Sequence, residues 1–423
     1  DGAITGSSTI NGVTIKADIT NFTNSILISQ DAGTGTLNAA NNNTGLGDSV
    51  FTALTTGDDN TAVGSASLDA NTTGAENTSV GKSSLTGNTT GDFNTAVGEN
   101  ALGNNTTADN NTAVGRRALL ANTTGTANVA VGSLAGDAIT TASYNVAIGT
   151  SALSADTLGG RAVAIGASAL GRQNFTSATD NYNIGIGYDA GLNITTGVQN
   201  TLIGGLSGDA ITTASNNAAV GYAALTSNTT GASNVAFGGE SLATNTTASN
   251  NTALGYRSLY LNTTGTTNVA VGAFSLDANT TASDNTAVGY ASLSSNTTGA
   301  YNTAMGRQAL WANTTGANNT AIGKDAMIAN TEGTVNTAVG VDSLTANTTG
   351  ASNTAVGQAA LEANTTASFN TGIGRNALAV NTTGANNTAT GYNSLVANTT
   401  GVSNTAVGSG ALDANTTASA NTA

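Results

Sequence analysis

The sequence predicts an all-β protein, a parallel β-solenoid (β-roll) of about 22 coils in which each coil is one 17-residue repeat. The first observation is the period: a line close to Asn-Thr-Ala-Val-Gly-x-x-Ala-Leu-x-x-Asn-Thr-Thr-Gly starts at Asn43 and returns every 17 residues to Asn145 and Ala162. After one four-residue slip it returns at Asn183 and stays in step to Asn421. The second is the length of the unit, which is too short to bury a core unless neighbouring units stack.

Each repeat predicts two short strands, because it offers too few apolar positions for a helix and contains a helix-breaking Asn-Thr-Thr-Gly. We number the repeat from its Asn and use residues 60–76 as the example. Position 4 is apolar, as in Val63, and position 9 is usually Leu, as in Leu68. We expect one strand at Thr-Ala-Val and the other around Ala-Leu, with turns at the position-5 Gly and at Asn-Thr-Thr-Gly. Small residues at positions 3 and 8 predict a thin interior.

Glycine at position 5 occurs in every complete repeat from Gly47 to Gly408. A position that never carries a Cβ predicts a positive φ or a close approach of two backbones. We therefore expect structural turn glycines at this position, among them Gly64, Gly81, Gly98, Gly289 and Gly408. The Asn residues at positions 1 and 12 predict columns that hydrogen-bond from coil to coil.

One substitution pattern predicts which positions share the interior. Three repeats replace the position-9 Leu by Gly, and the same three replace the position-12 Asn by Ile: Gly136 with Ile139, Gly191 with Ile194, and Gly208 with Ile211. The loss of an apolar side chain at one position and its gain at the other predict that both reach the same volume.

The domain organisation follows from the period. Residues 1–42 are off-period and are expected to form an N-terminal β cap or linker, with a hairpin at Ile10-Asn11-Gly12-Val13 and a strand at 24–29. Residues 43–423 form the repeat shaft, and the four extra residues within 162–182 are expected to loop out at the coil edge without breaking the stack. Because the last repeat begins at Asn421 and stops, we expect a distal domain beyond this sequence.

Composition excludes several classes of function. Ten basic against 24 acidic residues give a net charge of −14, which argues against nucleic-acid binding. No run of 18 apolar residues is present, so we expect no membrane insertion. Without His or Cys, catalytic triads and His or Cys zinc sites cannot be built, and we expect no catalytic residue, no metal and no cofactor. The carboxylates that could form a glycosidase pair, Asp58 with Asp59 and Asp277 with Asp284, are expected to be surface charge.

Tyrosines at position 6 provide a candidate binding surface. Tyr222, Tyr256 and Tyr290 recur in every second repeat and predict a ridge with rings roughly 10 Å apart. Such a ridge could stack sugar rings of a surface glycan, although tyrosines that merely flank a corner are the interpretation we favour. Tyr188 and Tyr392 share the position.

Repeats such as Asn285–Tyr301 resemble those of bacteriophage tail-fibre proteins and, with a longer period, the head repeats of trimeric autotransporter adhesins. The segment Ile10-Asn-Gly-Val-Thr-Ile15 resembles one that often precedes such arrays. The resemblance implies a left-handed β-roll, an intertwined homotrimeric fibre, and an extracellular place on a virion tail fibre or a cell surface. It also implies attachment to a host glycan or receptor through the distal domain.

The function we expect is therefore that of a structural extracellular fibre shaft of the phage tail-fibre kind. Its alternatives are a cell-surface trimeric adhesin head, an ice-binding β-solenoid with a threonine face, and a polysaccharide-degrading tailspike. Trimerisation has a physical argument of its own: one Val and one Leu per coil bury little area, so three chains packed along an axis would provide the Ala and Val faces with a second partner.

Overall fold

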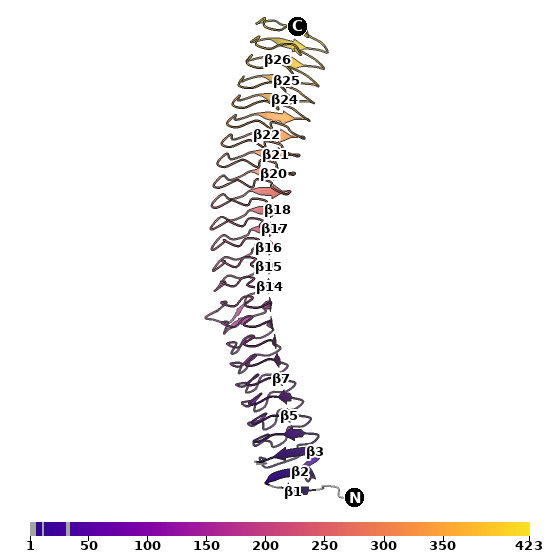
Figure 1. The fold of residues 1–423 in the computed structure, drawn as a ribbon, viewed down its shortest axis with the longest axis vertical. Helices are drawn as coiled ribbons and strands as arrows, with labels where there is room; N and C mark the ends of the chain where they lie inside the picture. The colour runs from indigo at the N-terminus through magenta and orange to yellow at the C-terminus, as the bar shows by residue number, and fades with distance from the viewer. Residues whose placement is uncertain (1–5, 11, 31–33) are drawn as a thin grey trace. The chain divides into compact units, whose positions relative to one another are not determined.

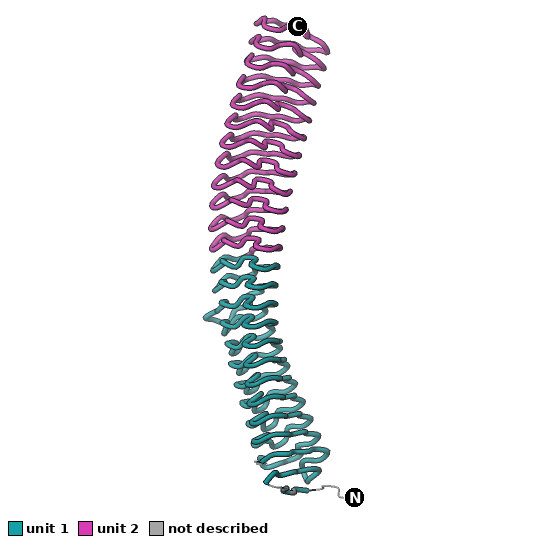
Figure 2. The backbone as a smooth tube through the Cα atoms, in the orientation of Figure 1, with its two compact units in different colours: residues 1–215 teal, residues 216–423 magenta. Residues whose placement is uncertain are grey.

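The computed structural model describes residues 6–10, 12–30 and 34–423, and these residues contain no helix. They form an all-β parallel solenoid of about 22 coils, as the repeat predicts (Figure 1). Contacts divide the chain into two compact units, residues 1–215 and 216–423 (Figure 2). Each unit is described by itself.

Unit 1 begins with an antiparallel hairpin of β1 (Gly6–Ile10) and β2 (Val13–Ile19), in which Ile10 pairs with Val13. The predicted hairpin is thus present, although Asn11 of its turn lies outside the described residues. Strand β3 (Phe22–Ser29) contains the predicted strand 24–29; it pairs antiparallel with β2 and parallel with β4 (Thr44–Leu46). The first segment therefore passes from antiparallel to parallel pairing where the repeats start.

Each coil contributes one strand of three residues, at positions 2 to 4, and successive strands pair in parallel and in register within each unit. In unit 1 they are β4, β5 (Thr61–Val63), β6 (Thr78–Val80), β7 (Thr95–Val97), β8 (Thr112–Val114), β9 (Val129–Val131), β10 (Val146–Ile148), β12 (Val163–Ile165), β14 (Ile184–Ile186) and β15 (Thr201–Ile203). In unit 2 they are β16 (Ala218–Val220), β17 (Val235–Phe237), β18 (Thr252–Leu254), β19 (Val269–Val271), β20 (Thr286–Val288), β21 (Thr303–Met305), β22 (Thr320–Ile322), β23 (Thr337–Val339), β24 (Thr354–Val356), β25 (Thr371–Ile373), β26 (Thr388–Thr390) and β27 (Thr405–Val407).

The second predicted strand of each coil is wrong, because the stretch around positions 8 and 9 is a series of tight turns. In the coil of residues 60–76, the backbone N–H of Ser67 donates to the carbonyl of Gly64, and that of Asn71 donates to Leu68. Positions 7 and 9 have positive φ, 55° at Ala66 and 50° at Leu68, which no extended strand allows. A 17-residue coil must reverse its direction within a few residues, and these left-handed residues provide the reversal.

The position-9 leucine accepts a left-handed conformation, which costs an L-residue roughly 1–2 kcal/mol. Two contacts offset that cost. The side chain of Leu85 is fully buried, and its backbone N–H donates to the carbonyl of Ala101 in the next coil, at 3.0 Å. Full burial of a leucine contributes about 1.5–3 kcal/mol, so the turn and the core stabilise each other.

The turn glycines occupy a conformation that only glycine tolerates. Gly64, Gly81, Gly98, Gly289 and Gly408 have φ between 127° and 142°. A Cβ on Gly289 would lie 2.5 Å from the carbonyl oxygen of Gly306 in the next coil. The predicted positive φ is therefore confirmed for all five glycines, and the close backbone approach for all but Gly408, whose Cβ would meet only the Cβ of Ala411 at 3.9 Å.

The two asparagine columns are confirmed as buried hydrogen-bond ladders. At position 1, Nδ2 of Asn77 donates to Oδ1 of Asn60 at 3.1 Å and to the carbonyl of Gly91 at 2.8 Å. At position 12, Nδ2 of Asn88 donates to Oδ1 of Asn71 at 2.9 Å. Because most coils repeat the same donors and acceptors, amides that would otherwise be buried without partners are satisfied along those parts of the stack.

The exchange between positions 9 and 12 is confirmed by distance. A Cβ built on Gly136 would lie 3.0 Å from Cδ1 of Ile139, and one on Gly208 would lie 2.8 Å from Cδ1 of Ile211. The isoleucine thus fills the volume that leucine fills elsewhere. The exchange interrupts the position-12 ladder: among the described residues Oδ1 of buried Asn122 accepts no hydrogen bond, because the next coil carries Ile139.

Position 4 lies on the outside of the solenoid. In a strand successive side chains alternate between faces, and here the small residue at position 3 is the one that points inward. Ala287 is fully buried, whereas its neighbours Thr286 and Val288 are only half-buried. The expectation that the Ala and Val faces both await a partner is therefore wrong for alanine, whose face is already covered within its own coil.

Candidate functional site

The four-residue insertion is the main irregularity in the coils of unit 1, and it is more ordered than the predicted loop. Strands β12 and β14 on either side of it pair in register, Val163 with Ile184, so the stack continues as expected. The extra residues place β13 (Thr179–Asp180) beside β11 (Gly159–Gly160) in a small parallel sheet of its own. The backbone N–H of Arg161, next to this second sheet, donates to the carbonyl of Ser143 in the segment 141–144 of the preceding coil, at 3.2 Å.

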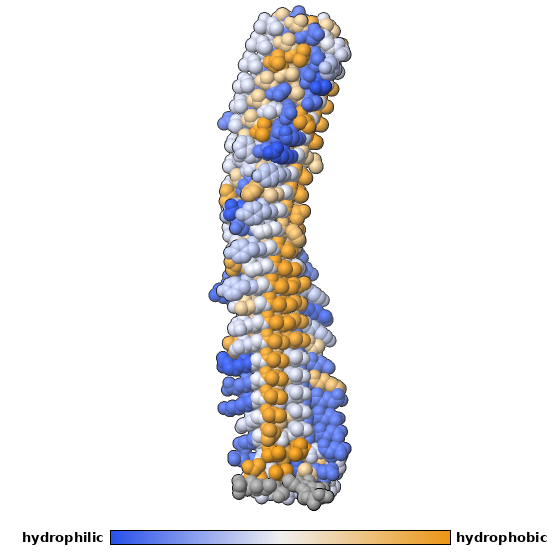
Figure 3. All heavy atoms as spheres, turned by 45° about the vertical axis from the view of Figure 1, so that its right-hand side comes forward, coloured by the Kyte–Doolittle hydropathy of each residue, from blue (hydrophilic) through white to orange (hydrophobic). Residues whose placement is uncertain are grey.

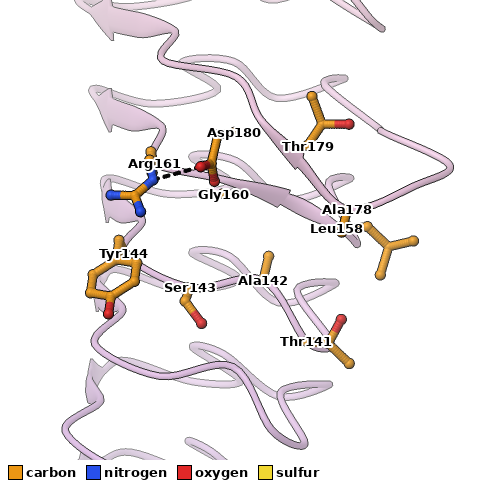
Figure 4. A pocket seen from close by; sticks show the side chains of 10 residues that line it. All are labelled: Thr141, Ala142, Ser143, Tyr144, Leu158, Gly160, Arg161, Ala178, Thr179 and Asp180. Carbon is orange, nitrogen blue, oxygen red and sulfur yellow. Dashed lines mark ion pairs between the residues drawn. The ribbon is translucent and has the colours of Figure 1, made fainter.

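A pocket of about 440 Å³ lies between that segment and the small sheet (Figure 4). It is lined by Thr141, Ala142, Ser143, Tyr144, Leu158, Gly160, Arg161, Ala178, Thr179 and Asp180. Gly160 packs closely against the wall of the pocket, since a Cβ there would lie 3.0 Å from the carbonyl oxygen of Ser143. The lining combines hydroxyl groups, one aromatic ring and one ion pair.

Three residues at position 17 of successive coils form a column at the mouth of the pocket. The guanidinium of Arg161 lies 4.9 Å from the ring centre of Tyr144 and 6.0 Å from that of Tyr182, within the range of cation–π contacts. Nε of Arg161 also donates to Oδ2 of Asp180 at 2.9 Å. That hydrogen bond, together with the charge of Asp180, raises the pKa of Arg161, so the guanidinium is charged throughout the biological pH range.

A buried carboxylate, Asp156, replaces the ladder asparagine beneath this pocket. Its Oδ2 accepts from Nε2 of Gln173 at 2.6 Å, and its Oδ1 accepts from the backbone N–H groups of Gly159 and Phe175. Burial raises the pKa of Asp156, and these hydrogen bonds oppose the shift. Nδ2 of Asn183, at position 1, in turn donates to Oε1 of Gln173 at 2.8 Å, so a buried polar contact joins the two columns here, although Ile139 and Ile194 interrupt the position-12 ladder on either side.

The predicted tyrosine ridge is only partly assembled. Tyr256 and Tyr290 are exposed, and Phe274 lies between them in edge-to-face contact, with ring centres 5.5 Å and 6.1 Å away. Tyr222 stands apart from this contact, because the coil between it and Tyr256 carries Glu240 at position 7, where the next intervening coil carries Phe274. Since Phe274 fills the space between the two rings, the ridge is a packed aromatic cluster and offers no gap for a sugar between them.

A second arginine lies beside this cluster. Arg257 contacts the rings of Tyr256 and Tyr260 at 5.3 Å and 5.0 Å, and its Nε donates to Glu240 at 2.7 Å. Sequence reasoning missed both arginine clusters, because it searched a single column of tyrosines. The signal that could have found them is an Arg next to Tyr at neighbouring variable positions, as in Tyr256-Arg257.

Three of the four candidate carboxylates hydrogen-bond to a neighbouring coil. Asp58 accepts a hydrogen bond from the backbone N–H of Asn41, Asp277 from Ser294, and Asp284 from Thr267, each across neighbouring coils. Asp59 is exposed at a position-17 turn, with φ of 58°. Among the described residues no group of three or more acidic side chains could hold a metal ion. These residues also include no helix with the length and apolar character that crossing a membrane requires.

The outward face of the strands carries an apolar column in each unit. Its most exposed members are Leu46, Val80, Val131 and Ile148 in unit 1, and Phe237, Leu254, Met305, Ile322, Ile373 and Val407 in unit 2. Their exposed fractions run from 36% to 63%. Figure 3 shows hydrophobic residues gathered in a narrow stripe along unit 1.

No family model matches the chain, and no curated protein matches it.

Proposed function

We propose that this chain is the shaft of an extracellular fibre that attaches a virion or a cell to a surface, and that it works as a parallel homotrimer. The observation that carries the proposal is the apolar column at position 4, which a solitary chain leaves in water. Monomeric proteins rarely expose long continuous apolar surfaces, and those that exist usually mark an interface. The resemblance to tail-fibre repeats supports three chains.

The magnitude of the column supports association. Covering the exposed part of one position-4 side chain contributes roughly 1 kcal/mol. Over about 22 coils the total for each chain is on the order of 20 kcal/mol, whereas association costs about 4–15 kcal/mol in lost freedom. The column is thus large enough to hold chains together.

Parallel chains around a threefold axis suit a column of this kind. Every coil rises by the same strand spacing, so the same position-4 residue of each chain would stand at the same height on the axis. The interior of each coil is already filled by Ala, Leu and Asn, and association therefore needs no refolding of the single chain.

Native mass spectrometry and light scattering test the assembly, which should contain three chains of 41.0 kDa each. In a second chain all apolar position-4 residues of unit 2 are changed to Thr. This variant should already be monomeric at protein concentrations far above those at which the wild-type trimer dissociates. These residues are Val220, Phe237, Leu254, Val271, Val288, Met305, Ile322, Val339, Val356, Ile373 and Val407. Thr390 already occupies this position in one coil, so threonine fits the strand.

The matched control changes the same number of exposed threonines at position 14 to Ser, on another side of the coil. They are Thr230, Thr247, Thr264, Thr281, Thr298, Thr315, Thr349, Thr366, Thr383, Thr400 and Thr417. This variant should remain trimeric. A wild-type chain that is monomeric and stably folded would refute the trimer, and equal dissociation of both variants would refute the role of the apolar column.

One observation favours ice binding as a second candidate. The same outward face carries Thr at position 2 in eight consecutive coils, from Thr286 to Thr405, beside the aliphatic column. A regular threonine and valine array on a parallel sheet is the surface that an ice-binding solenoid needs. The two functions compete for one face: thermal hysteresis from a monomer supports ice binding, whereas a trimer without hysteresis supports the shaft.

A further inference from the structure

We propose that the pocket between residues 141–144 and the sheet of β11 and β13 binds an uncharged sugar unit of a surface polysaccharide. This inference deepens the attachment role proposed above and rests on it for the choice of a surface polymer as ligand. The site itself is formed within unit 1 of a single chain (Figure 4).

The size of the pocket suits a small ligand. Its volume of about 440 Å³ lies within the range of small-molecule sites, roughly 300–1,000 Å³. Its lining combines residues of the small sheet of β11 and β13, which the insertion adds, with residues 141–144 of the preceding coil.

The charges in the pocket favour an uncharged ligand. Arg161 and Asp180 contribute one positive and one negative charge and neutralise each other across 2.9 Å. An anion would compete with Asp180 inside a chain whose net charge is already −14, and a cation would meet Arg161. A polyhydroxylated ligand instead donates to the second carboxylate oxygen of Asp180 and accepts from the guanidinium N–H groups that the ion pair leaves available.

The remaining lining matches a sugar ring. Thr141, Ser143 and Thr179 line the pocket. The hydroxyl of Thr179 donates to the carbonyl of Ser177 at 3.0 Å, whereas Ser143 Oγ, which accepts from the backbone N–H of Thr126 at 3.0 Å, keeps its own proton to donate. The ring of Tyr144 is 56% exposed and offers an apolar face beside these polar groups. An aromatic face next to hydroxyls and a charged fork is complementary to a hexose, which has C–H groups on its ring face and hydroxyls on its edge.

The cluster of Tyr256, Phe274 and Tyr290 is the competing site, and the geometry favours the pocket over it. The edge-to-face contacts of Phe274 occupy the space between the tyrosines. A sugar would gain one exposed ring there and no enclosed polar groups.

Affinity electrophoresis of the full chain tests the proposal. The probes are three neutral polysaccharides (dextran, yeast mannan and a galactan) and one polyanion, heparin, each cast in a native gel. We expect retardation by at least one neutral polymer and none by heparin. The dissociation constant for the retarding polymer, measured by titration calorimetry, should rise at least tenfold in Tyr144→Ala and in Asp180→Asn.

The matched control is Tyr301→Ala, which removes an exposed tyrosine from position 17 of a regular coil without a pocket. Ala127 occupies position 17 naturally with φ of 57°, so alanine is compatible with the fold at this place. Tyr144→Phe, which keeps the ring, should bind within threefold of wild type. The position-4 threonine variant should bind as well per chain as wild type, so loss of the trimer and loss of the sugar site are separate results.

Three outcomes would overturn the proposal. The first is no retardation by any neutral polymer, and the second is retardation by heparin alone. The third is that Tyr301→Ala or Tyr290→Ala weakens binding as much as Tyr144→Ala, which would place the sugar on exposed tyrosines in general or on the aromatic cluster.

Discussion

Exchanging the core residues of one ordinary coil tests how the interior is filled. Leu293 is fully buried, with φ of 54°, and Asn296 lies three residues later in the position-12 ladder. Nδ2 of Asn296 donates to Oδ1 of Asn279 at 3.1 Å and to the carbonyl of Gly299 at 2.9 Å. The perturbations are Leu293→Gly, Asn296→Ile, and both together, which recreates the natural pair Gly136 and Ile139 in a new coil.

The structure predicts the free energy of each change. Leu293→Gly removes a buried side chain, which costs about 2–5 kcal/mol, but relieves about 1 kcal/mol of left-handed strain. Asn296→Ile leaves the buried oxygens of Asn279 and Gly299 without this amide donor, which lowers the free energy of unfolding by about 1–3 kcal/mol for each oxygen. The larger side chain also crowds Leu293, which lowers it by about 1–3 kcal/mol more. The double variant has neither the cavity nor the crowding, so its cost should be roughly 2–4 kcal/mol, at least about 2 kcal/mol less than the sum of the single changes.

Guanidinium denaturation followed by circular dichroism gives the free energies of unfolding, and native-state hydrogen exchange of residues 285–301 shows whether the effect is local. The control combines Asn296→Ile with Leu395→Gly, the same two changes in coils far apart in unit 2. That pair should be additive. If the pair within one coil is also additive to within about 0.5 kcal/mol, positions 9 and 12 do not share a volume in unit 2 and the reasoning fails.

Three further predictions follow from single features. Gly238→Ala should destabilise the chain by more than about 2 kcal/mol, because φ is 136° and the Cβ would lie 2.5 Å from the carbonyl of Gly255. Gly239→Ala, whose Cβ would meet only a ring atom at 3.6 Å, should change the melting temperature little, and equal effects would contradict the backbone argument. Because burial raises the pKa of Asp156, the folded chain keeps a proton that the unfolded chain has lost, and stability falls as the pH rises through the raised pKa. The melting temperature should therefore be higher near pH ~4.5 than at pH ~7, and this difference should be smaller in Asp156→Asn. If Asp156→Asn has the same pH dependence of the melting temperature as wild type, Asp156 is not its cause. Incubation with a bound polysaccharide should release no reducing ends, and release that a single Asp→Asn change abolishes would show the tailspike alternative to be correct.

Much of the fold could be predicted because each coil repeats the same solution. A residue type that recurs at one position in about 22 coils reports a local requirement of the backbone or of the stack. For this reason the sequence alone predicted the position-5 glycine, the asparagine ladders and the pairing of Gly136 with Ile139. In each case the partner lies three residues away or at the same position of the next coil.

The residues of the candidate site could be predicted only in part from the sequence. Tyr256 and Tyr290 were predicted as an open ridge, but Phe274 comes from position 7 of the intervening coil, and no single column includes it. Tyr144, Arg161 and Tyr182 share position 17, yet the pocket beside them depends on how four extra residues fold back as β13. The course of an insertion is set by contacts that occur once in the chain, so no repetition reveals it.

The sequence by itself determined the period, the parallel stacking of coils and the places where a Cβ is forbidden, since these depend on what every coil has in common. Only the tertiary structure decided which side of each strand faces inward and where the backbone is left-handed. Period-two alternation separates position 3 from positions 2 and 4 but does not say which set is buried, and the structure places the position-3 residue, such as Ala287, inside. Likewise an Ala-Leu pair has the composition of a strand, and only the need to close a 17-residue coil places Leu68 at positive φ.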